Sequence, residues 1–344
     1  MGGFVRTVLV AVVASLAIAA SSAVAHAQTT VLRIGTVAPE GSRFTKDLRA
    51  MTQEIERLSG QQVTFKWYTG ARLGGEKAMA DTLMDPDGKL EAVAFSGIGL
   101  PYLVPEMKVW IYPGLLQGYE EVDYLENRYK EEFVKYFDKS GLVMLTWAEA
   151  GFNYINSAER LDTFDQLKAK KIWLWTDDEH TITAAKAMGL VLDPSSLGDL
   201  QTWLAAQRIT VFMYPPLAII AFGLQKYSRF MIDMPVTFLC GAFVIRKDVF
   251  DKLPEDVQRA IHAVGDKWSV RLTRSWRAEA ALALEAMKKQ GTTVVHWNDT
   301  EKQKFFLAAA AQRGRVARMW GLEPLMRRFA ADLEVLRQAR QQPR

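Results

Sequence analysis

The sequence predicts an α/β protein with two lobes and mostly parallel sheets. Segments typical of strands alternate with segments typical of helices, and such alternation favours parallel strands joined by helical crossovers. About 315 residues follow an N-terminal export signal, which is more than one ordinary core holds. In addition, the stretch from Trp147 to Trp175 has strand-like segments on both sides of a polar turn and a short helix, which predicts one wall of a ligand cleft and the crossover between the lobes.

Residues 1–27 have the pattern of a secretory signal peptide. Arg6 precedes a run of small apolar residues, and the run ends in Ala25-His26-Ala27. This pattern predicts cleavage after Ala27 and export to the periplasm. A retained membrane anchor is the alternative, but the run is rich in Ala and Ser and ends in a good cleavage site. No later stretch reaches the roughly 20 apolar residues that a membrane-spanning helix needs, so we expect a soluble exported protein.

The composition excludes several classes of protein. The chain has 43 Lys and Arg against 39 Asp and Glu, a balance too even to indicate nucleic-acid binding. Cys240 is the single cysteine and stands among apolar residues, so we interpret it as a small buried hydrophobe. No spacing of Cys and His suggests a zinc site, and we expect no metal and no cofactor.

The N-terminal half predicts three strands and two helices. Residues 31–37, 63–68 and 90–95 have the apolar patterns of strands. Residues 44–59 carry apolar side chains at helical spacing, and residues 77–84 predict a second helix. Each predicted helix joins two predicted strands, as in a parallel sheet.

The middle and C-terminal segments continue this pattern and then turn helical. Residues 142–147 and 171–175 predict strands on the two sides of the polar turn. Residues 254–286 predict two helices, and residues 292–297 a short late strand. Residues 301–337 predict helix with a break near the glycine at position 321. The basic C-terminal end is interpreted as a solvated helix face and a frayed tail, with docking on an anionic membrane surface as the alternative.

The sequence contains no convincing catalytic motif. The acidic run that begins at Asp177 precedes an apolar helix, so we interpret it as a favourable helix N-terminus rather than a metal site. Ser195 and Ser196 have no partnered base in the sequence. The turn around Gly74 lacks the Gly-Lys-Ser/Thr ending of a phosphate loop. We therefore predict that the protein is not an enzyme.

Several motifs, found in order along nearly the whole mature chain, carry a resemblance to one family. They are Val37-Ala-Pro-Glu-Gly-Ser42, Phe65-Lys-Trp-Tyr68, Leu73-Gly-Gly-Glu76, Val104-Pro-Glu-Met107, Tyr112-Pro113, Thr163-Phe-Asp-Gln-Leu-Lys-Ala-Lys-Lys-Ile172 and Lys247-Asp-Val-Phe-Asp-Lys-Leu-Pro-Glu-Asp-Val-Gln258. Together they resemble the solute-binding proteins of tripartite ATP-independent periplasmic (TRAP) transporters, the DctP family. The resemblance implies a two-lobed periplasmic binding protein fold, with a ligand cleft between the lobes and long bridging helices.

The sequence departs from the family at positions that the resemblance assigns to the ligand. Trp173 and Asn153 stand where the family usually has arginines that bind a carboxylate, and Tyr214 stands where it often has asparagine. Leu197 falls near a position that packs over the ligand. Guanidinium offers two parallel donors matched to a carboxylate, whereas indole offers one N–H and a large apolar face. We therefore expect a hydrophobic or amphipathic ligand, lipid-like or aromatic.

The candidate ligand-binding residues are Trp67, Trp147, Phe152, Asn153, Trp173, Trp175, Leu197, Tyr214 and Phe238. In the alternative interpretation Trp173 and Trp175 are core residues, and a relocated arginine binds a conventional organic acid. Arg72, Arg208 and Arg246 are the candidates for that arginine.

The resemblance also implies the partners and the division of the chain. We expect a monomer that delivers a small-molecule ligand to the large and small TRAP membrane subunits, without contact to nucleic acid or stable insertion into a membrane. A periplasmic carrier of lipid-like molecules with a different membrane partner is the alternative. Residues 28–149 and about 236–285 are assigned to lobe I, and residues 150–235 and about 286–344 to lobe II.

Overall fold

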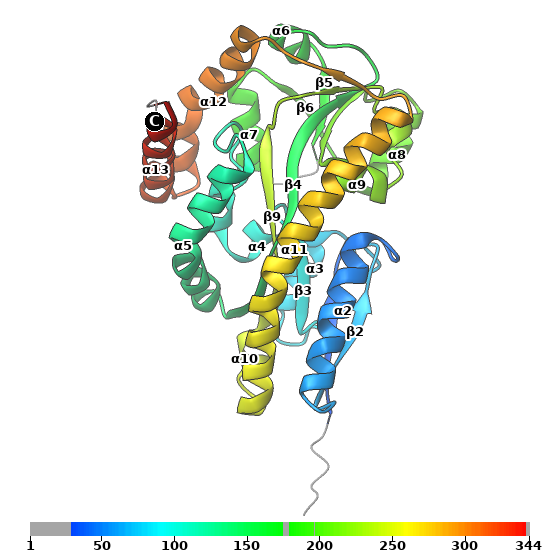
Figure 1. Ribbon diagram of the computed structural model, residues 1–344, viewed down its shortest axis with the longest axis vertical. Helices are drawn as coiled ribbons and strands as arrows, with labels where there is room; N and C mark the ends of the chain where they lie inside the picture. Colours follow the sequence, from blue (N-terminus) through cyan, green and yellow to red (C-terminus); the bar gives the residue numbers. More distant parts are fainter. Residues whose placement is uncertain (1–28, 175–178, 196, 342–344) are drawn as a thin grey trace, which may run out of the picture.

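The computed structural model describes residues 29–174, 179–195 and 197–341, and these form two α/β lobes arranged along one long axis (Figure 1). One lobe contains β1 to β3, and the other contains β5 to β8 with β10. Two long strands, β4 and β9, run side by side between the lobes. The predicted fold class is therefore confirmed.

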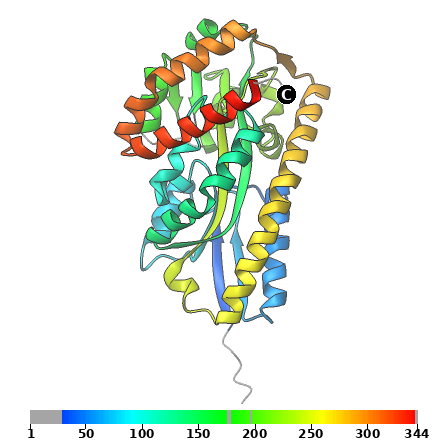
Figure 2. The ribbon, with the colours of Figure 1, turned by 60° about the vertical axis from the view of Figure 1, so that its left-hand side comes forward.

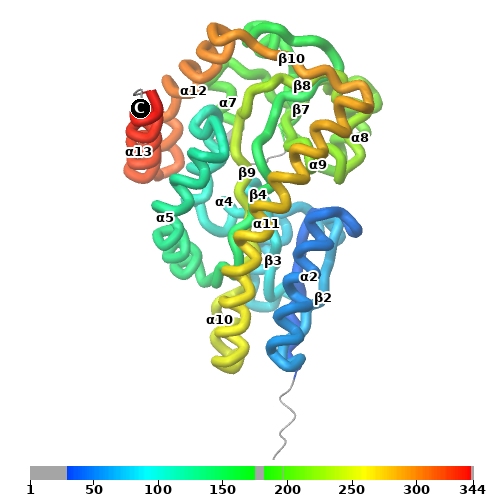
Figure 3. The backbone as a smooth tube through the Cα atoms, viewed as in Figure 1, coloured from blue at the N-terminus to red at the C-terminus, as the bar shows by residue number. Residues whose placement is uncertain are grey.

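The strands form a continuous hydrogen-bonded series in the order β2-β1-β3-β9-β4-β7-β5-β6, with β8 and β10 attached beside β4. Their bounds are β1 Thr30–Gly35, β2 Val63–Tyr68, β3 Ala92–Ser96, β4 Leu142–Ser157, β5 Lys171–Leu174, β6 Val191–Pro194, β7 Val211–Tyr214, β8 Phe230–Ile232, β9 Thr237–Arg246 and β10 Thr293–Val295. The short late strand predicted near residue 294 is thus present, as β10, and it pairs with β8 (Figure 3).

Helices cover both faces of the strands. Their bounds are α2 Arg43–Leu58, α3 Glu76–Met84, α4 Leu100–Leu103, α5 Tyr119–Lys139, α6 Phe164–Lys168, α7 Glu179–Ala187, α8 Leu197–Ala205, α9 Pro216–Ala221, α10 Lys247–Phe250, α11 Glu255–Lys289, α12 Asp299–Met319 and α13 Glu323–Gln341, with short 3-10 helices at Pro105–Val109 and Gln225–Tyr227. No helix among the described residues combines the length and apolar character needed to cross a membrane.

The direction of the strands differs between the lobes and the crossing. The pairs β1–β2, β1–β3, β5–β6, β5–β7 and β8–β10 are parallel, whereas every antiparallel pair contains β4 or β9. The sheet is therefore mixed, with parallel strands inside each lobe. The antiparallel pair β4–β9 connects the strands of one lobe to those of the other.

Strand β4 is much longer than the predicted strand 142–147, because the segment expected to be a polar turn continues the strand to Ser157. The predicted end of the strand at Trp147 was therefore wrong, and the turn lies later, at residues 158–163, before the predicted short helix, which is present as α6. Register shifts of the β9 pairing occur between Met144 and Thr146 and again between Glu149 and Gly151, where Gly151 has a φ of 95°. Such bulges allow a polar, glycine-containing segment to stay in a sheet while the strand bends.

Helix α11 is a single helix of 35 residues, so the prediction of two helices was wrong. It runs along the long axis past both lobes (Figure 1). Gly265, inside this helix, does not break it but lets it approach β4 closely, since a Cβ there would lie 1.8 Å from the carbonyl oxygen of Leu145. The predicted break near Gly321 is confirmed, because α12 ends and α13 begins on either side of it.

The C-terminal helix α13 packs against α5 (Figure 2). Arg337 of α13 pairs with Glu121 at 2.8 Å, and Asp332 accepts from Arg128 at 2.6 Å. Although residues beyond 286 were assigned to lobe II, α13 thus contacts a helix that was assigned to lobe I. The lobe boundaries stay a prediction.

Candidate functional site

A cavity lies where the two lobes meet, and its walls come from both. Lobe I contributes residues around β1, α2, α3 and β3, and the other lobe contributes β5, β7 and the start of α9. The crossing strands β4 and β9 and the helix α11 complete the walls. The space measures about 890 Å³, including its opening to solvent.

The walls of the cavity are mainly apolar. The aromatic members of the lining are Phe44, Phe95, Tyr214, Phe222, Phe243 and Trp276. Small and aliphatic side chains fill most of the remaining wall, among them Leu48, Ala94, Leu174 and Ala218. No Lys or Arg is among the described residues that line this space. A lining of this kind favours apolar surface on a ligand.

One carboxyl group, that of Glu76, lines the cavity. The backbone N–H of Ser96 donates to Glu76 Oε1 at 2.7 Å, and the Ser96 hydroxyl donates to Oε2 at 2.8 Å. Burial raises the pKa of Glu76 to about 7, although the hydrogen bonds from Ser96 and from the Gly99 backbone favour the charged form. A carboxyl this deeply buried without a cation titrates near neutrality instead of remaining fully charged.

Of the predicted site residues that the structure describes, Asn153 and Tyr214 line the cavity. Asn153 follows the bulge in β4, opposite Thr237 of β9. Its Nδ2 donates to Thr237 Oγ1 at 2.8 Å, while its buried Oδ1 has no hydrogen-bond partner among the described residues. Tyr214 is the last residue of β7, and burial raises the pKa of its hydroxyl.

Trp173 lies in the core of its lobe and does not line the cavity. It is fully buried, its Nε1 donates to Ser195 Oγ at 2.8 Å, and its ring centroid lies 5.9 Å from that of Tyr214. The next residue along β5, Leu174, lines the cavity instead, in keeping with the alternation of side chains along a strand. Trp173 therefore packs behind Tyr214 of the cavity wall.

Four other predicted residues belong to packed aromatic clusters outside the cavity wall. Trp147 contacts Trp110 with ring centroids 5.3 Å apart, and Phe152 contacts Phe238 at 5.2 Å. Trp67 packs against Phe243 at 5.8 Å. Of these rings only Phe243 reaches the cavity.

The remaining two predicted residues are Leu197 and Trp175. Leu197 is partly buried against the same core as Trp173, and it is not part of the cavity wall. Trp175 lies outside the described residues, as does the acidic pair at positions 177 and 178.

Sequence reasoning missed most of the wall. Phe44, Phe222 and Trp276 come from α2, the end of α9 and α11, three elements far apart in the chain. Each follows an ordinary amphipathic pattern, so nothing local separates a cavity-lining ring from a core ring. Glu76 could have been found, since it ends the family motif Leu73-Gly-Gly-Glu76 and begins α3. It was not identified as a site residue.

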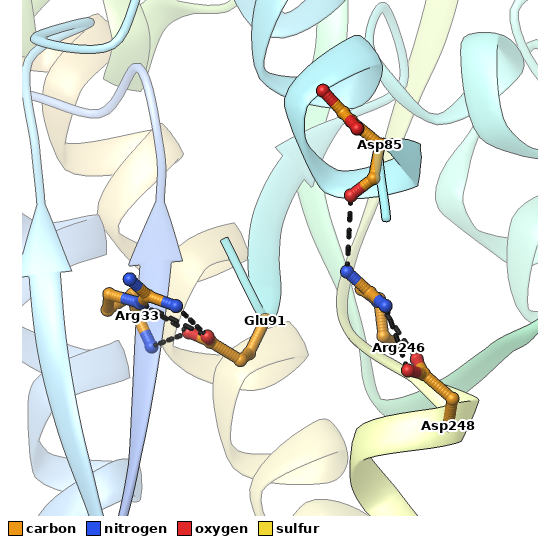
Figure 4. A network of polar contacts seen from close by, with 5 residues as sticks. All are labelled: Arg33, Asp85, Glu91, Arg246 and Asp248. Atoms are coloured by element: carbon orange, nitrogen blue, oxygen red, sulfur yellow. Dashed lines mark hydrogen bonds and ion pairs between the residues drawn. The ribbon is translucent and has the colours of Figure 1, made fainter. Parts of the chain in front are cut away.

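The three arginines considered as replacements all lie away from the cavity wall. Arg246 pairs with Asp248 at 2.8 Å and donates to the Asp85 carbonyl oxygen, as Figure 4 shows. The Arg208 guanidinium lies 3.6 Å from the ring centroid of Trp203. Arg72 is exposed near the start of α3.

A second polar cluster lies beside the cavity, in the groove between α5 and α11. Asp123, Glu126 and Glu149 place carboxylate oxygens within 4.8 Å of one another. Arg277 of α11 donates to both oxygens of Glu149, at 2.8 and 2.6 Å, and to Asp123. The Arg277 guanidinium therefore pairs with two of the three carboxylates, those of Glu149 and Asp123. Burial raises the pKa of Glu126 to about 7.

The comparisons with solved structures agree with this architecture. A TRAP periplasmic solute-binding protein from Haemophilus influenzae RdAW, solved with L-gulonate, aligns with a TM-score of 0.80 at 18% identity, over 88% of this chain and 100% of the other. A TRAP periplasmic solute-binding protein from Polaromonas sp. JS666, bound to D-erythronate, aligns with a TM-score of 0.78 at 21% identity, over 88% and 98%.

Sequence comparison gives a further relative and a family. A Haemophilus influenzae protein described as uncharacterized is 25% identical over 205 residues, which cover 59% of this chain and 61% of that relative. The chain therefore matches less than two thirds of that protein's length. A family model described as bacterial extracellular solute-binding protein, family 7 (DctP) matches residues 34–317. This protein belongs to the DctP family of solute-binding receptors.

Proposed function

We propose that this chain is the periplasmic receptor of a TRAP-type secondary transporter and that its ligand is hydrophobic or amphipathic, lipid-like or aromatic. The receptor binds its ligand in the cavity between the lobes, closes around it and delivers it to the large and small membrane subunits. Export with cleavage after Ala27 belongs to the same proposal. Closure is a hinge motion, in which the ligand shifts the balance between open and closed forms.

The lining of the cavity is the observation that carries the ligand class. Aromatic and aliphatic side chains from both lobes form its walls, and its described part contains no Lys or Arg. An organic anion enclosed there would lack a charge-assisted interaction of roughly 1.5–3 kcal/mol and would be partly desolvated. Burial of apolar ligand surface instead gains roughly 25 cal/mol per Å².

A conventional organic-acid receptor is the second candidate, because the solved relatives named above hold L-gulonate and D-erythronate. That candidate needs a cation near the ligand. Arg208 and Arg246 are held by neighbours elsewhere, and Arg72 is exposed, so each would have to move to reach the cavity.

Competition between two kinds of probe tests the ligand class. The neutral fluorophore N-phenyl-1-naphthylamine is titrated against the mature protein, and L-gulonate and D-erythronate are titrated by calorimetry. We expect saturable binding of one fluorophore per chain and no heat from either acid. Micromolar binding of either acid, together with no fluorophore binding, would overturn the proposed ligand class.

A matched pair of variants locates the bound probe. Ala150 lines the cavity, whereas Ala280 lies on α11 outside it and is also partly buried. Ala150→Leu fills part of the cavity and is expected to weaken fluorophore binding at least tenfold. Ala280→Leu should leave binding unchanged. Equal effects of the two substitutions would place the fluorophore elsewhere.

A further inference from the structure

Some polar groups that line the cavity already have hydrogen-bond partners within the described part of the protein, and others do not. Glu76 and Ser96 bond to each other, and the Thr36 hydroxyl accepts from the backbone N–H of Ala38 at 3.3 Å. These groups already take part in hydrogen bonds within the wall. They are part of the wall rather than a recognition element.

Asn153, in contrast, has one side-chain hydrogen bond and one side-chain atom without a partner among the described residues. Its side chain is only 5% exposed, and it is held in place by the bond from Nδ2 to Thr237. Within residues 29–174, 179–195 and 197–341, its Oδ1 has no hydrogen-bond partner although it is buried in a residue that lines the cavity. A buried acceptor without a partner is unfavourable, so a ligand group that donates to it gains more than it would on an exposed surface.

Tyr214 offers a second polar group at the same cavity. Its side chain is buried, and its hydroxyl forms no hydrogen bond within the part of the chain that the structure describes. The hydroxyl can both donate and accept. Besides the hydrogen-bonded polar groups of the wall, the cavity thus presents the neutral groups of Asn153 and Tyr214 to a ligand.

The surrounding charges decide which kind of ligand group fits. Glu76 is the one acid among the described lining residues, and no described cation lines the cavity. A ligand carboxylate would therefore lie near the Glu76 carboxyl and the Asn153 acceptor oxygen with no described cation opposite it, and could accept only from neutral donors such as the Tyr214 hydroxyl. A hydroxyl or an amide N–H would meet an acceptor that needs a donor.

We infer that the ligand carries an uncharged hydrogen-bond donor, a hydroxyl or amide N–H, that binds Oδ1 of Asn153, while its apolar body contacts the aromatic walls. This inference rests on the proposed function and narrows its ligand class. In this ligand the polar end is neutral, whereas D-erythronate and L-gulonate each carry a carboxylate.

Three probes built on a ten-carbon straight chain test the inference by displacement of N-phenyl-1-naphthylamine. Decan-1-ol has a hydroxyl donor, decyl methyl ether has only an acceptor, and decanoate has a negative charge. For the wild-type protein we expect decan-1-ol to bind about five- to tenfold more tightly than the ether, the range of one neutral hydrogen bond, and decanoate to bind most weakly. Decanoate binding as tightly as decan-1-ol would overturn the inference.

Substitution of Asn153 assigns the effect to its side chain. Asn153→Leu should remove the preference for alcohol over ether while fluorophore binding persists. Asn127→Leu, at an exposed position on α5, is the matched control and should keep the preference. If Asn153→Leu does not fold, as judged by circular dichroism, Asn153→Ala serves instead. A preference that survives substitution of Asn153 overturns the inference.

The outcomes separate this inference from the proposed function. If the decyl probes bind without discrimination, the apolar ligand class stands and only the role of Asn153 fails. If neither the fluorophore nor any decyl probe binds and L-gulonate does, the proposed ligand class itself fails.

Discussion

Glu76 and Glu149 are both buried carboxyl groups, but they lie in opposite electrostatic environments. Glu76, at the cavity, accepts hydrogen bonds only from neutral donors, and no cation pairs with it within the described residues. Glu149, at the bulge of β4, is bound by both arms of the Arg277 guanidinium. Burial raises the pKa of each.

The difference between the two carboxyl groups lies in the position of the Arg277 guanidinium, which is at the crossing of the lobes and not at the cavity. Arg277 ties the long helix α11 to the crossing strand β4 and, through Asp123, to α5. The described wall of the cavity has no such cation. Charge is therefore used to hold the crossing between the lobes together, and the cavity is left suited to neutral and apolar surface.

We expect the largest loss of stability from removal of the Arg277 guanidinium, which pairs with Glu149. Arg277→Gln leaves Glu149, whose side chain is 1% exposed, without its cation. Removal of one partner of a buried pair costs about 3–5 kcal/mol of the free energy of unfolding. Urea unfolding at neutral pH measures it.

Arg274→Gln is the matched control for that measurement, since Arg274 is an exposed arginine one turn earlier on the same helix. Its substitution should change stability by less than about 0.5 kcal/mol. A loss below 1 kcal/mol for Arg277→Gln would mean that the pair contributes little to the crossing.

The second effect concerns Glu76 and appears as a dependence of stability on pH. Because its folded pKa of about 7 lies above its ordinary value of 4.5, the folded state keeps a proton that the unfolded state releases between these values. Its contribution to stability is therefore complete below pH 4.5 and is lost as the pH rises to about 7. Between pH 5 and pH 8 we expect a loss of about 2–3 kcal/mol.

Glu76→Gln isolates that contribution, since glutamine does not titrate and Glu126 and Glu149 remain in both proteins. The measurement is urea unfolding at pH 5 and pH 8 for both proteins. Equal pH dependence in the two would show that Glu76 is not the titrating group.

The smallest of the three effects concerns the close approach of α11 to β4. Gly265→Ala forces a methyl group against the Leu145 carbonyl oxygen, so helix and strand must separate. Overpacking of this kind costs about 1–3 kcal/mol, more than the helix propensity of alanine returns. Thermal unfolding measures it, with Gly314→Ala, at an uncrowded helical position of α12, as the control. A stabilised Gly265→Ala protein would contradict the close contact.

Much of the fold followed from local patterns. Helix α2 begins after Ser42, whose Oγ accepts from the Thr45 N–H, and its apolar spacing was visible in the sequence. The parallel pairs inside the lobes followed from the alternation of strands and helices. These features depend on residues that are near one another in the chain, which a sequence pattern records directly.

The tertiary structure decided what depends on distant segments. Only the pairing with β9 shows that the polar stretch after Trp147 continues as strand, because its hydrogen-bond partners lie some 90 residues away. Likewise only the packing of the lobes separates Asn153 and Tyr214, which line the cavity, from Trp173, which lies in the core. The sequence by itself determined the family and most of the element types. Which side chains face the ligand depends on how two lobes meet, and no local pattern encodes that.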